Sequence, residues 1–303
     1  MTDSYDLITG PGRLRLYKLN TDWKRERVVE VRDPSSTLLA RGRFAADADV
    51  LELAGLPDDR ECNVYIRHGH PLKRLFAATE TLRATPAPRR LRALISGSGR
   101  CGTVSLARYL DGLDYRDGAV CAARHETLWE HILPPLAAGN RDKVAAFMAG
   151  FNHHIESSPH FSLVPDLIAA DTVVHLIRDG RRVVQSGVNR DWYGKDSLWN
   201  AIKPDFPGDV FEKCCRFWAH TNRNMADVAQ HTVRLEDLAA SPQALAHLVE
   251  ALGLAPTDAP FPLANTGKTA STFDHWSARE HEVFAEVCGE LMDAHYPGWR
   301  KQG

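Results

Sequence analysis

A glycine-rich turn between a short apolar run and an amphipathic helix is the feature that most constrains the fold of this chain. Residues 95–106 read ISGSGRCGTVSL. Gly97, Gly99 and Gly102 permit a tight turn whose backbone N–H groups face one concavity. The helix that follows adds unpaired N–H donors and the positive end of its dipole. The stretch therefore predicts an anion site at the end of a strand of an α/β sheet.

This loop departs from the Walker pattern, which places a lysine directly after its last glycine. Here Thr103 follows Gly102, and Arg100 inside the loop is the nearby cation. A guanidinium has a planar fork of donors and does not deprotonate, so it can stabilise negative charge on an oxygen without magnesium. The loop thus favours an anion other than ATP with magnesium, and a P-loop kinase with a degenerate Walker loop stays as an alternative.

Strand-to-helix units continue beyond the loop. The near-continuous apolar run TVVHLI at residues 172–177 is typical of a strand covered on both faces. The segment TVRLEDL at residues 232–238 precedes a helix with Ser241 as its N-cap and Pro242 at its first position. Strands that alternate with helices predict a parallel sheet flanked by helices, whose ligands bind at the carboxyl ends of the strands.

Two more helices are predicted from periodicity and capping. One covers residues 210–226 and places Trp218 on its core face. The other begins at a capping box formed by Ser277 and Glu280. Residues 189–209, which precede the first of these helices, form a long loop rich in aromatic residues. Such a loop suits an acceptor lid or pocket.

The N-terminal part of the chain has a different pattern. Residues 13–84 contain short, partly alternating segments separated by Pro, Gly, Asp and Ser, as in antiparallel strands. The stretch ATPAPRR at residues 84–90 indicates a linker. We therefore expect a small β-rich domain at residues 1–88 and an α/β domain at residues 89–303. The role of the β-rich domain stays open between acceptor binding, self-association into a homo-oligomer and covering an edge of the core.

Composition excludes several classes of protein. A chain of 303 residues with 44% hydrophobic residues can bury a sizeable core. No apolar run approaches the ~18 residues of a membrane helix, and no signal peptide is evident, so we expect a cytoplasmic protein without a membrane partner. A formal charge of −2 gives no reason to expect nucleic-acid binding. The six cysteines lack C-x-x-C spacing, so we expect reduced thiols and no zinc site.

Two segments together carry a family resemblance. SGSGRCGTVSLARYL at residues 96–110 and VVHLIRDGRRVVQSG at residues 173–187 resemble the paired signature of sulfotransferases that use 3'-phosphoadenosine 5'-phosphosulfate, PAPS. VRLEDL at residues 233–238 and the C-terminal residues extend the resemblance over roughly residues 91–295. The resemblance implies a sulfotransferase-like α/β fold and leaves the N-terminal part of the chain outside it.

The resemblance also implies site residues. The loop would bind the 5'-phosphosulfate, and the second segment would bind the 3'-phosphate through Arg178 and Ser186, whose spacing of eight residues matches the family. Lys268, in a C-terminal loop, would supplement Arg178. The residues that would line the 5' end are Gly99, Arg100, Cys101, Gly102, Thr103 and Val104.

The sequence departs from the family at four positions. Cys101 replaces a serine and Val104 a hydroxyl residue, so the backbone and Arg100 would have to supply more of the 5' contacts. Gly180 stands where a proline is usual, and Leu235 stands where a tyrosine is usual. The second change puts an adenine contact from that position in doubt.

The implied reaction moves a sulfuryl group from PAPS to a hydroxyl of a small molecule or glycan by single in-line displacement, without a metal. The acceptor hydroxyl needs a base, and Glu126 in ARHETLWEH matches a glutamate that serves several branches of the family. His125 and His131 are the other candidates, although neighbours on a strand or helix do not point the same way. The alternative to an enzyme is a non-catalytic nucleotide-binding module, which would keep the phosphate sites and need no base.

Overall fold

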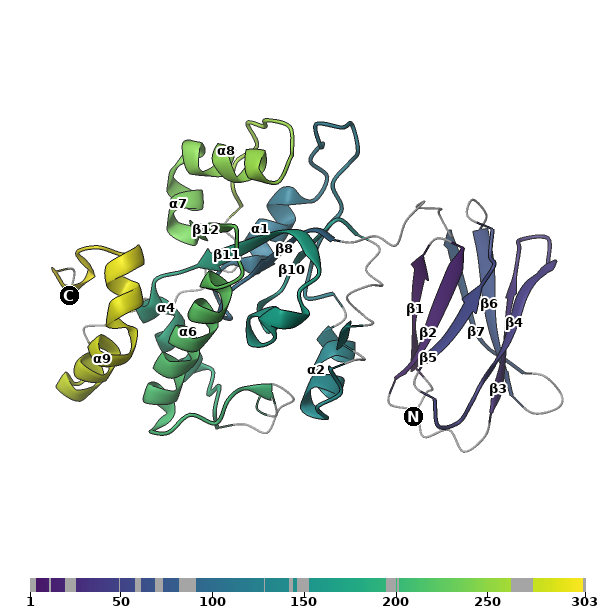
Figure 1. Ribbon diagram of the computed structural model, residues 1–303, viewed down its shortest axis with the longest axis horizontal. Helices are drawn as coiled ribbons and strands as arrows, with labels where there is room; N and C mark the ends of the chain where they lie inside the picture. Colours follow the sequence, from purple (N-terminus) through teal and green to yellow (C-terminus); the bar gives the residue numbers. More distant parts are fainter. Residues whose placement is uncertain are drawn as a thin grey trace. The chain divides into compact units, whose positions relative to one another are not determined.

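The computed structural model divides into two compact units (Figure 1). One unit comprises Met1–Arg89 with Ala149–Asn152, and the other comprises the rest of the chain. The residues that the structure describes are 4–10, 12–19, 26–48, 50–57, 61–68, 73–81, 91–127, 129–141, 144–145, 153–194, 200, 202–262 and 275–301. The predicted linker at 84–90 and Lys268 lie outside them.

The N-terminal unit consists of antiparallel strands in two sheets, with the orders β1-β2-β5 and β4-β3-β6-β7. Inward residues alternate along the strands and form one apolar core that draws on both sheets, as at Leu14 and Leu16 or Val29 and Val31. The predicted β-rich region is confirmed. The strands are β1 (Ser4–Gly10), β2 (Arg13–Leu19), β3 (Arg27–Arg32), β4 (Leu38–Phe44), β5 (Val50–Ala54), β6 (Glu61–His68) and β7 (Lys73–Thr81).

The second unit is built on a five-stranded sheet in the order β12-β11-β8-β10-β9. Every neighbouring pair is parallel, which confirms the predicted α/β class. The chain starts this sheet at its centre, moves to one edge and then to the other, so a topological switch point lies beside β8. The strands are β8 (Leu91–Ser96), β9 (Ala123–His125), β10 (Ile155–Ser157), β11 (Ala170–Ile177) and β12 (His231–Arg234).

Helices flank this sheet in two packing clusters. One cluster joins Ala93 and Ile95 of β8 to apolar residues of α1, α7 and α8, and the other joins Ile177 of β11 to those of α4, α6 and α9. Figure 1 shows α4, α6 and α9 gathered on one side of the strands. The helices are α1 (Thr103–Leu110), α2 (Trp129–Ala137), α4 (Gly180–Asn189), α6 (Val210–Ala226), α7 (Leu235–Ala240), α8 (Pro242–Ala251) and α9 (Ala278–His295).

Local capping explains where several helices begin. The side chain of Ser241 accepts a hydrogen bond from the Ala244 N–H at 3.2 Å and caps α8, as predicted. Ser277 and Glu280 form the predicted capping box at the start of α9. Each cap satisfies N–H groups that the helix itself leaves unpaired, so these starts are set by local sequence.

Candidate functional site

The glycine loop lies between the end of β8 and the start of α1, and its neighbours require glycine at two positions. A Cβ atom on Gly97 would lie 2.1 Å from the backbone oxygen of Leu176 in β11. Gly102 has a φ of 102°, and a Cβ there would lie 2.5 Å from Cδ1 of Leu235. The loop is therefore packed tightly against β11 on one side and α7 on the other.

Leu235 and Gly180, two departures from the family pattern, have structural explanations. Leu235 is buried in the core cluster next to Gly102, so its side chain supports the loop. A Cβ on Gly180 would lie 3.0 Å from the indole of Trp218. Trp218 is fully buried, as predicted, and its Nε1 donates to the backbone oxygen of Arg178 at 3.2 Å. A small residue at 180 is what allows this indole to approach.

The two segments that carry the family resemblance meet at one hydrogen bond. Arg178 directly follows β11, and its Nη1 donates to the backbone oxygen of Arg100 at 2.9 Å. Arg100 holds a left-handed backbone conformation, with a φ of 70°, which is uncommon for a residue with a side chain. The hydrogen bond joins the loop to the end of β11 and brings the two predicted phosphate sites together.

Arg100, Arg178 and Arg190 form a cluster of positive charge at this junction. None of the three side chains forms an ion pair with an acidic side chain of the described residues. Burial lowers the pKa of Arg100, and the charges of Arg190 and then Arg178 lower it further, while Glu126 acts in the opposite direction. Mutually repelling guanidinium groups without a carboxylate are suited to binding an anion of more than one charge.

Two serine hydroxyls supply further polar groups at the loop and at α4. Ser98, inside the loop, is fully buried, and its Oγ has no hydrogen-bond partner among the described residues. Buried hydroxyls are almost always hydrogen-bonded, so this atom fits an acceptor held in the loop. Ser186 lies in α4 and is half-buried. The sequence analysis singled out Ser186 and missed Ser98.

The predicted loop residues differ in what they can offer an anion. The Cys101 thiol is fully buried in the apolar core cluster, and burial raises its pKa to about 12. Its side chain is therefore part of the core on which the loop packs. The backbone N–H of Cys101 is the group left to bind the 5' end of a donor. Thr103 is the first residue of α1, Val104 is half-buried beside it, and Gly102 is the N-cap.

Glu126 and His125 are brought to the same place by an unusual backbone turn. β9 ends at His125, and Glu126 adopts a left-handed conformation with a φ of 48°. Glu126 Oε1 consequently lies 3.7 Å from His125 Nε2. The expectation that these neighbours point apart is therefore wrong, because the strand stops between them. His131 lies in α2, in a stretch whose side chains are outside the description.

The two candidate bases have opposite electrostatic environments. Burial and the charge of Arg108 lower the pKa of His125 to about 4, and His125 Nε2 is engaged with Thr103 Oγ1 at 3.0 Å. Burial and then the neighbouring Glu156 carboxylate raise the pKa of Glu126, against the opposing effect of Arg100. The pKa of Glu126 is thus shifted upwards, in the direction that suits a base. His125 is instead held by Thr103 at the start of α1.

A buried polar layer supports this corner of the site from β10. Glu156 is fully buried, and its carboxylate contacts His153 Nε2 at 2.7 Å and accepts from the Thr127 N–H at 3.0 Å. Ser157 donates from Oγ to the backbone oxygen of Thr103 at 3.0 Å. These bonds fix the segment after His125 and the first residue of α1 relative to the sheet.

The aromatic segment that follows α4 reaches the glycine loop. A Cβ on Gly99 would lie 3.2 Å from Cζ2 of Trp192, and one on Gly187 would lie 2.7 Å from Cε3 of the same ring. The Trp192 indole is therefore packed between the loop and α4. Arg190 and Trp192 were missed as individual site residues, although the aromatic character of residues 189–209 had marked this segment.

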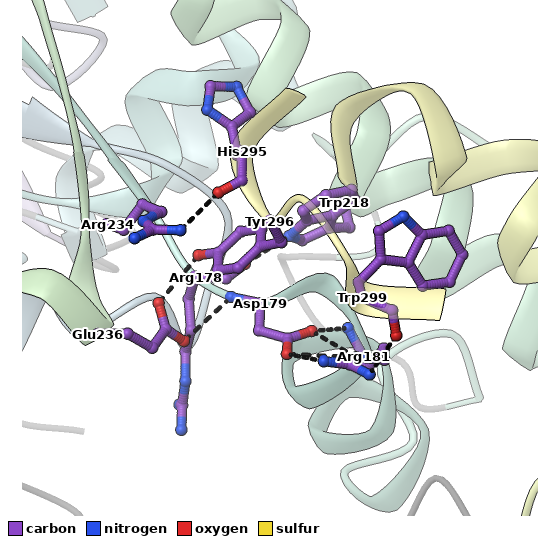
Figure 2. Close-up of polar contacts among 9 residues, drawn as sticks. All are labelled: Arg178, Asp179, Arg181, Trp218, Arg234, Glu236, His295, Tyr296 and Trp299. Carbon is purple, nitrogen blue, oxygen red and sulfur yellow. Dashed lines mark hydrogen bonds and ion pairs between the residues drawn. The ribbon is translucent and has the colours of Figure 1, made fainter. Parts of the chain in front are cut away.

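A polar cavity of about 380 Å³ lies near the carboxyl ends of β11 and β12, and Figure 2 shows several of the side chains that line it. Its charged groups bond to one another: Asp179 pairs with Arg181 at 2.8 Å, and Glu236 accepts from the Tyr296 hydroxyl at 2.9 Å. The lining residues are Asp179, Arg181, Arg182, Arg234, Glu236, Tyr296 and Pro297. The cavity is thus separate in its residues from the glycine loop.

Among the residues that the structure describes, no three His, Cys, Asp or Glu side chains gather as a metal site. Over the same residues, no helix combines the length and the apolar character needed to cross a membrane.

Together, the sheet order and the loop define an α/β protein with a glycine-rich loop at its topological switch point. A scan against protein-family models and a search of curated proteins found no match. The chain is similar to the sulfotransferase domain of the olefin synthase of Synechococcus PCC 7002, with a TM-score of 0.37, 17% identity, and coverage of 65% of this chain and 84% of that one.

Two other solved structures are similar to parts of the chain. The sulfotransferase domain of the curacin biosynthetic pathway has a TM-score of 0.33 and 15% identity, covering 57% of this chain and 77% of that one. The fn3 domain of the human collagen alpha-1(XX) chain has a TM-score of 0.24 and 13% identity, covering 29% of this chain and 86% of that one. All three TM-scores lie below 0.5, so the functional proposal rests on the site residues.

Proposed function

We propose that this protein transfers a sulfuryl group from PAPS to a hydroxyl of a small molecule or glycan. The observation that carries the proposal is the junction of Arg178 with the backbone oxygen of Arg100, around which three arginines gather that pair with no acidic side chain of the described residues. A donor with phosphate groups at its 3' and 5' ends needs two anion sites at a fixed separation. The loop and the end of β11 would provide two such sites, and the Arg178 to Arg100 hydrogen bond supports this assignment because it joins them.

Each half of the donor would be held by a different segment. Arg100, the loop N–H groups and the Ser98 hydroxyl would bind the 5'-phosphosulfate, and the start of α1 adds its dipole. Arg178 and Ser186 would bind the 3'-phosphate. We assign Arg190 to the 5' half as well, because its charge acts on Arg100 more strongly than that of Arg178.

The chemistry needs in-line positioning, charge stabilisation and removal of one proton. Arg100 would neutralise the charge that develops on the phosphate oxygen as the bond between that oxygen and sulfur breaks. Glu126 would accept the proton of the acceptor hydroxyl while the hydroxyl oxygen bonds to sulfur. The products are a sulfate ester and 3',5'-adenosine bisphosphate, and Glu126 then releases its proton to solvent.

Glu126 is the better candidate for the base on geometric grounds. Its carboxylate makes no hydrogen bond with a described residue, and it is close enough to Arg100 for that positive charge to lower its pKa. His125 uses Nε2 to contact Thr103, so taking a proton there would first break that contact. We therefore assign His125 the task of orienting the Thr103 hydroxyl at the start of α1.

Calorimetric binding tests the donor. In magnesium-free buffer, 3',5'-adenosine bisphosphate should bind clearly tighter than 5'-AMP, and ATP with magnesium should bind weakly. Arg178→Gln should remove the preference for the bisphosphate and leave 5'-AMP binding in place. Equal affinity of the wild-type protein for the bisphosphate and 5'-AMP would remove the proposed 3' site.

Mass spectrometry tests the reaction. A pool of hydroxyl-bearing metabolites and glycans incubated with PAPS should show a sulfate added to at least one compound, and Glu126→Gln should abolish that product while still binding the bisphosphate. Tight bisphosphate binding without a sulfated product in any pool would favour a non-catalytic nucleotide-binding module. Unchanged turnover in Glu126→Gln would move the role of base to a histidine.

A further inference from the structure

The peptide bond between Arg178 and Asp179 is held from both of its polar ends (Figure 2). Its carbonyl oxygen accepts from the Trp218 Nε1–H at 3.2 Å, and its N–H donates to Glu236 Oε1 at 3.2 Å. A peptide unit is planar, so fixing both ends fixes its plane and the position of the Arg178 Cα within it. The guanidinium is then held at its far end by the backbone oxygen of Arg100.

Glu236 is in turn held by the C-terminal end of α9. The hydroxyl of Tyr296, the residue after that helix, donates to Glu236 Oε2 at 2.9 Å. Arg234 donates from Nη1 to the backbone oxygen of His295 at 2.8 Å, which ties the same turn to the end of β12. Glu236 therefore bridges Tyr296 and the Asp179 N–H with its two oxygens.

The Asp179 side chain connects this bridge to α4. It accepts from the Arg181 N–H at 2.9 Å as the N-cap of the helix that carries Ser186. It also pairs with the Arg181 guanidinium, whose Nη1 donates to the backbone oxygen of Trp299 at 3.2 Å. The start of α4 is thus attached to the C-terminal residues at a second point.

The bridge is half-buried at Glu236 and Tyr296 and buried at the N-cap of α4. Asp179 and Arg181 are 7% and 8% exposed. Burial, followed by the neighbouring Glu236 carboxylate, raises the pKa of Tyr296 far above its ordinary value, so its hydroxyl stays a donor. A donor of this kind to a partly buried carboxylate is stronger than a neutral pair in water.

We propose that Tyr296 and Glu236 are positioning residues that set the recognition of the 3'-phosphate. Glu236 accepts from the N–H of the Arg178 to Asp179 peptide, and Tyr296 donates to Glu236, so their influence should fall on the 3' half of the site and spare the 5' half. The inference rests on the proposed function, because it presumes a donor with a 3'-phosphate. Asp179 and Glu236 also line the polar cavity. They are already bonded to protein donors there, which agrees with a positioning role.

The test is the ratio of two dissociation constants, for 3',5'-adenosine bisphosphate and for 5'-AMP, measured by calorimetry on the full chain. Tyr296→Phe should weaken bisphosphate binding about 3- to 10-fold, on the order of one typical hydrogen bond, and leave 5'-AMP binding unchanged. Glu236→Ala should do the same. Glu236→Gln retains an oxygen for the Asp179 N–H and should restore most of the preference.

Tyr115→Phe is the matched control, because its buried hydroxyl contacts the Cys121 thiol and belongs to a different cluster. It should leave both dissociation constants as in the wild type, whatever its effect on the melting temperature. Equal weakening of both ligands in Tyr296→Phe, or a lower melting temperature with an unchanged ratio, would show that the bridge is only structural. Absence of any bisphosphate preference in the wild-type protein would instead overturn the proposed function itself.

Discussion

Arg178 Nη1 and the backbone oxygen of Arg100 lie 2.9 Å apart, although 78 positions separate the two residues in the chain. This contact uses one of the five N–H donors of the guanidinium and leaves the others for a ligand. It also holds the loop at the residue whose backbone is left-handed. The cation proposed for the 3'-phosphate therefore also contacts the backbone of the loop proposed for the 5' end.

Arg190 offers a direct test of the positive cluster. Arg190→Gln should weaken binding of 3',5'-adenosine bisphosphate roughly 3- to 10-fold at low salt, because a partly exposed charge near the ligand is worth about 1 kcal/mol. The difference from wild type should shrink as salt is added. Arg182→Gln, an exposed arginine of α4 that lines the polar cavity, is the control and should bind like wild type. Equal effects of both substitutions would mean that only net charge matters.

The pH dependence of turnover tests the choice of base. The pKa of Glu126 is raised by burial, so its active carboxylate form is lost as the pH falls through a value above the ordinary 4.5 of glutamate. The acid limb of kcat/KM should therefore lie above that value. His125→Gln should lower turnover through the Thr103 contact and keep the limb, because His125, with a pKa of about 4, is already neutral there. A limb that disappears in His125→Gln would assign it to the histidine.

Much of the architecture was predictable because the deciding signals are local. The helix predicted at residues 210–226 is α6, and the caps at Ser241 and Ser277 begin α8 and α9 where the sequence places them. Such signals depend on side chains that contact their own backbone a few residues away. Fold class follows from the same information, because strands that alternate with helices have few ways to pack.

The site was less predictable, because tertiary contacts decide it. β9 and β10 are three residues each, too short to show a period in sequence, yet their ends place Glu126 and Ser157. The left-handed backbone at Glu126 has no sequence signal, since glutamate rarely adopts it. Trp192 and Arg190 reach the loop only because α4 ends beside it.

His175 predicts how stability depends on pH. It is fully buried, contacts Asn222 Oδ1 from Nε2 at 2.8 Å, and burial lowers its pKa from 6.5 to about 4. The unfolded chain therefore binds the extra proton first, and stability present above pH 6.5 is lost as the pH falls towards 4.

His175→Gln removes this titration while keeping a polar group for Asn222. The loss of unfolding free energy between pH 7.5 and 5.5 should be smaller in this variant by about 1.4 kcal/mol, the worth of one pKa unit. Urea denaturation at the two pH values measures it. His247→Gln, on the exposed side of α8, is the control and should keep the wild-type pH dependence. An identical slope in His175→Gln would contradict a neutral buried imidazole.

Substitutions at Gly102 and Gly112 distinguish the cost of a left-handed backbone from the cost of packing at the glycine loop. Both residues have left-handed φ angles, of 102° and 86°. A Cβ on Gly112 would meet no atom within 4 Å, whereas one on Gly102 would lie 2.5 Å from Leu235 Cδ1. Gly112→Ala should therefore cost about 1–2 kcal/mol from the backbone alone. Gly102→Ala should cost at least about 1 kcal/mol more, because Leu235 must move within a packed core.

A double-mutant cycle with Leu235→Ala tests the origin of that difference. In the Leu235→Ala background the overlap is gone, so Gly102→Ala should cost no more than Gly112→Ala does in the wild-type protein, as measured by urea denaturation. A cost of Gly102→Ala that is independent of Leu235 would place the strain in the loop backbone itself. The coupling energy thus measures how strongly α7 holds the loop, because Leu235 is the first residue of that helix and is buried against Gly102.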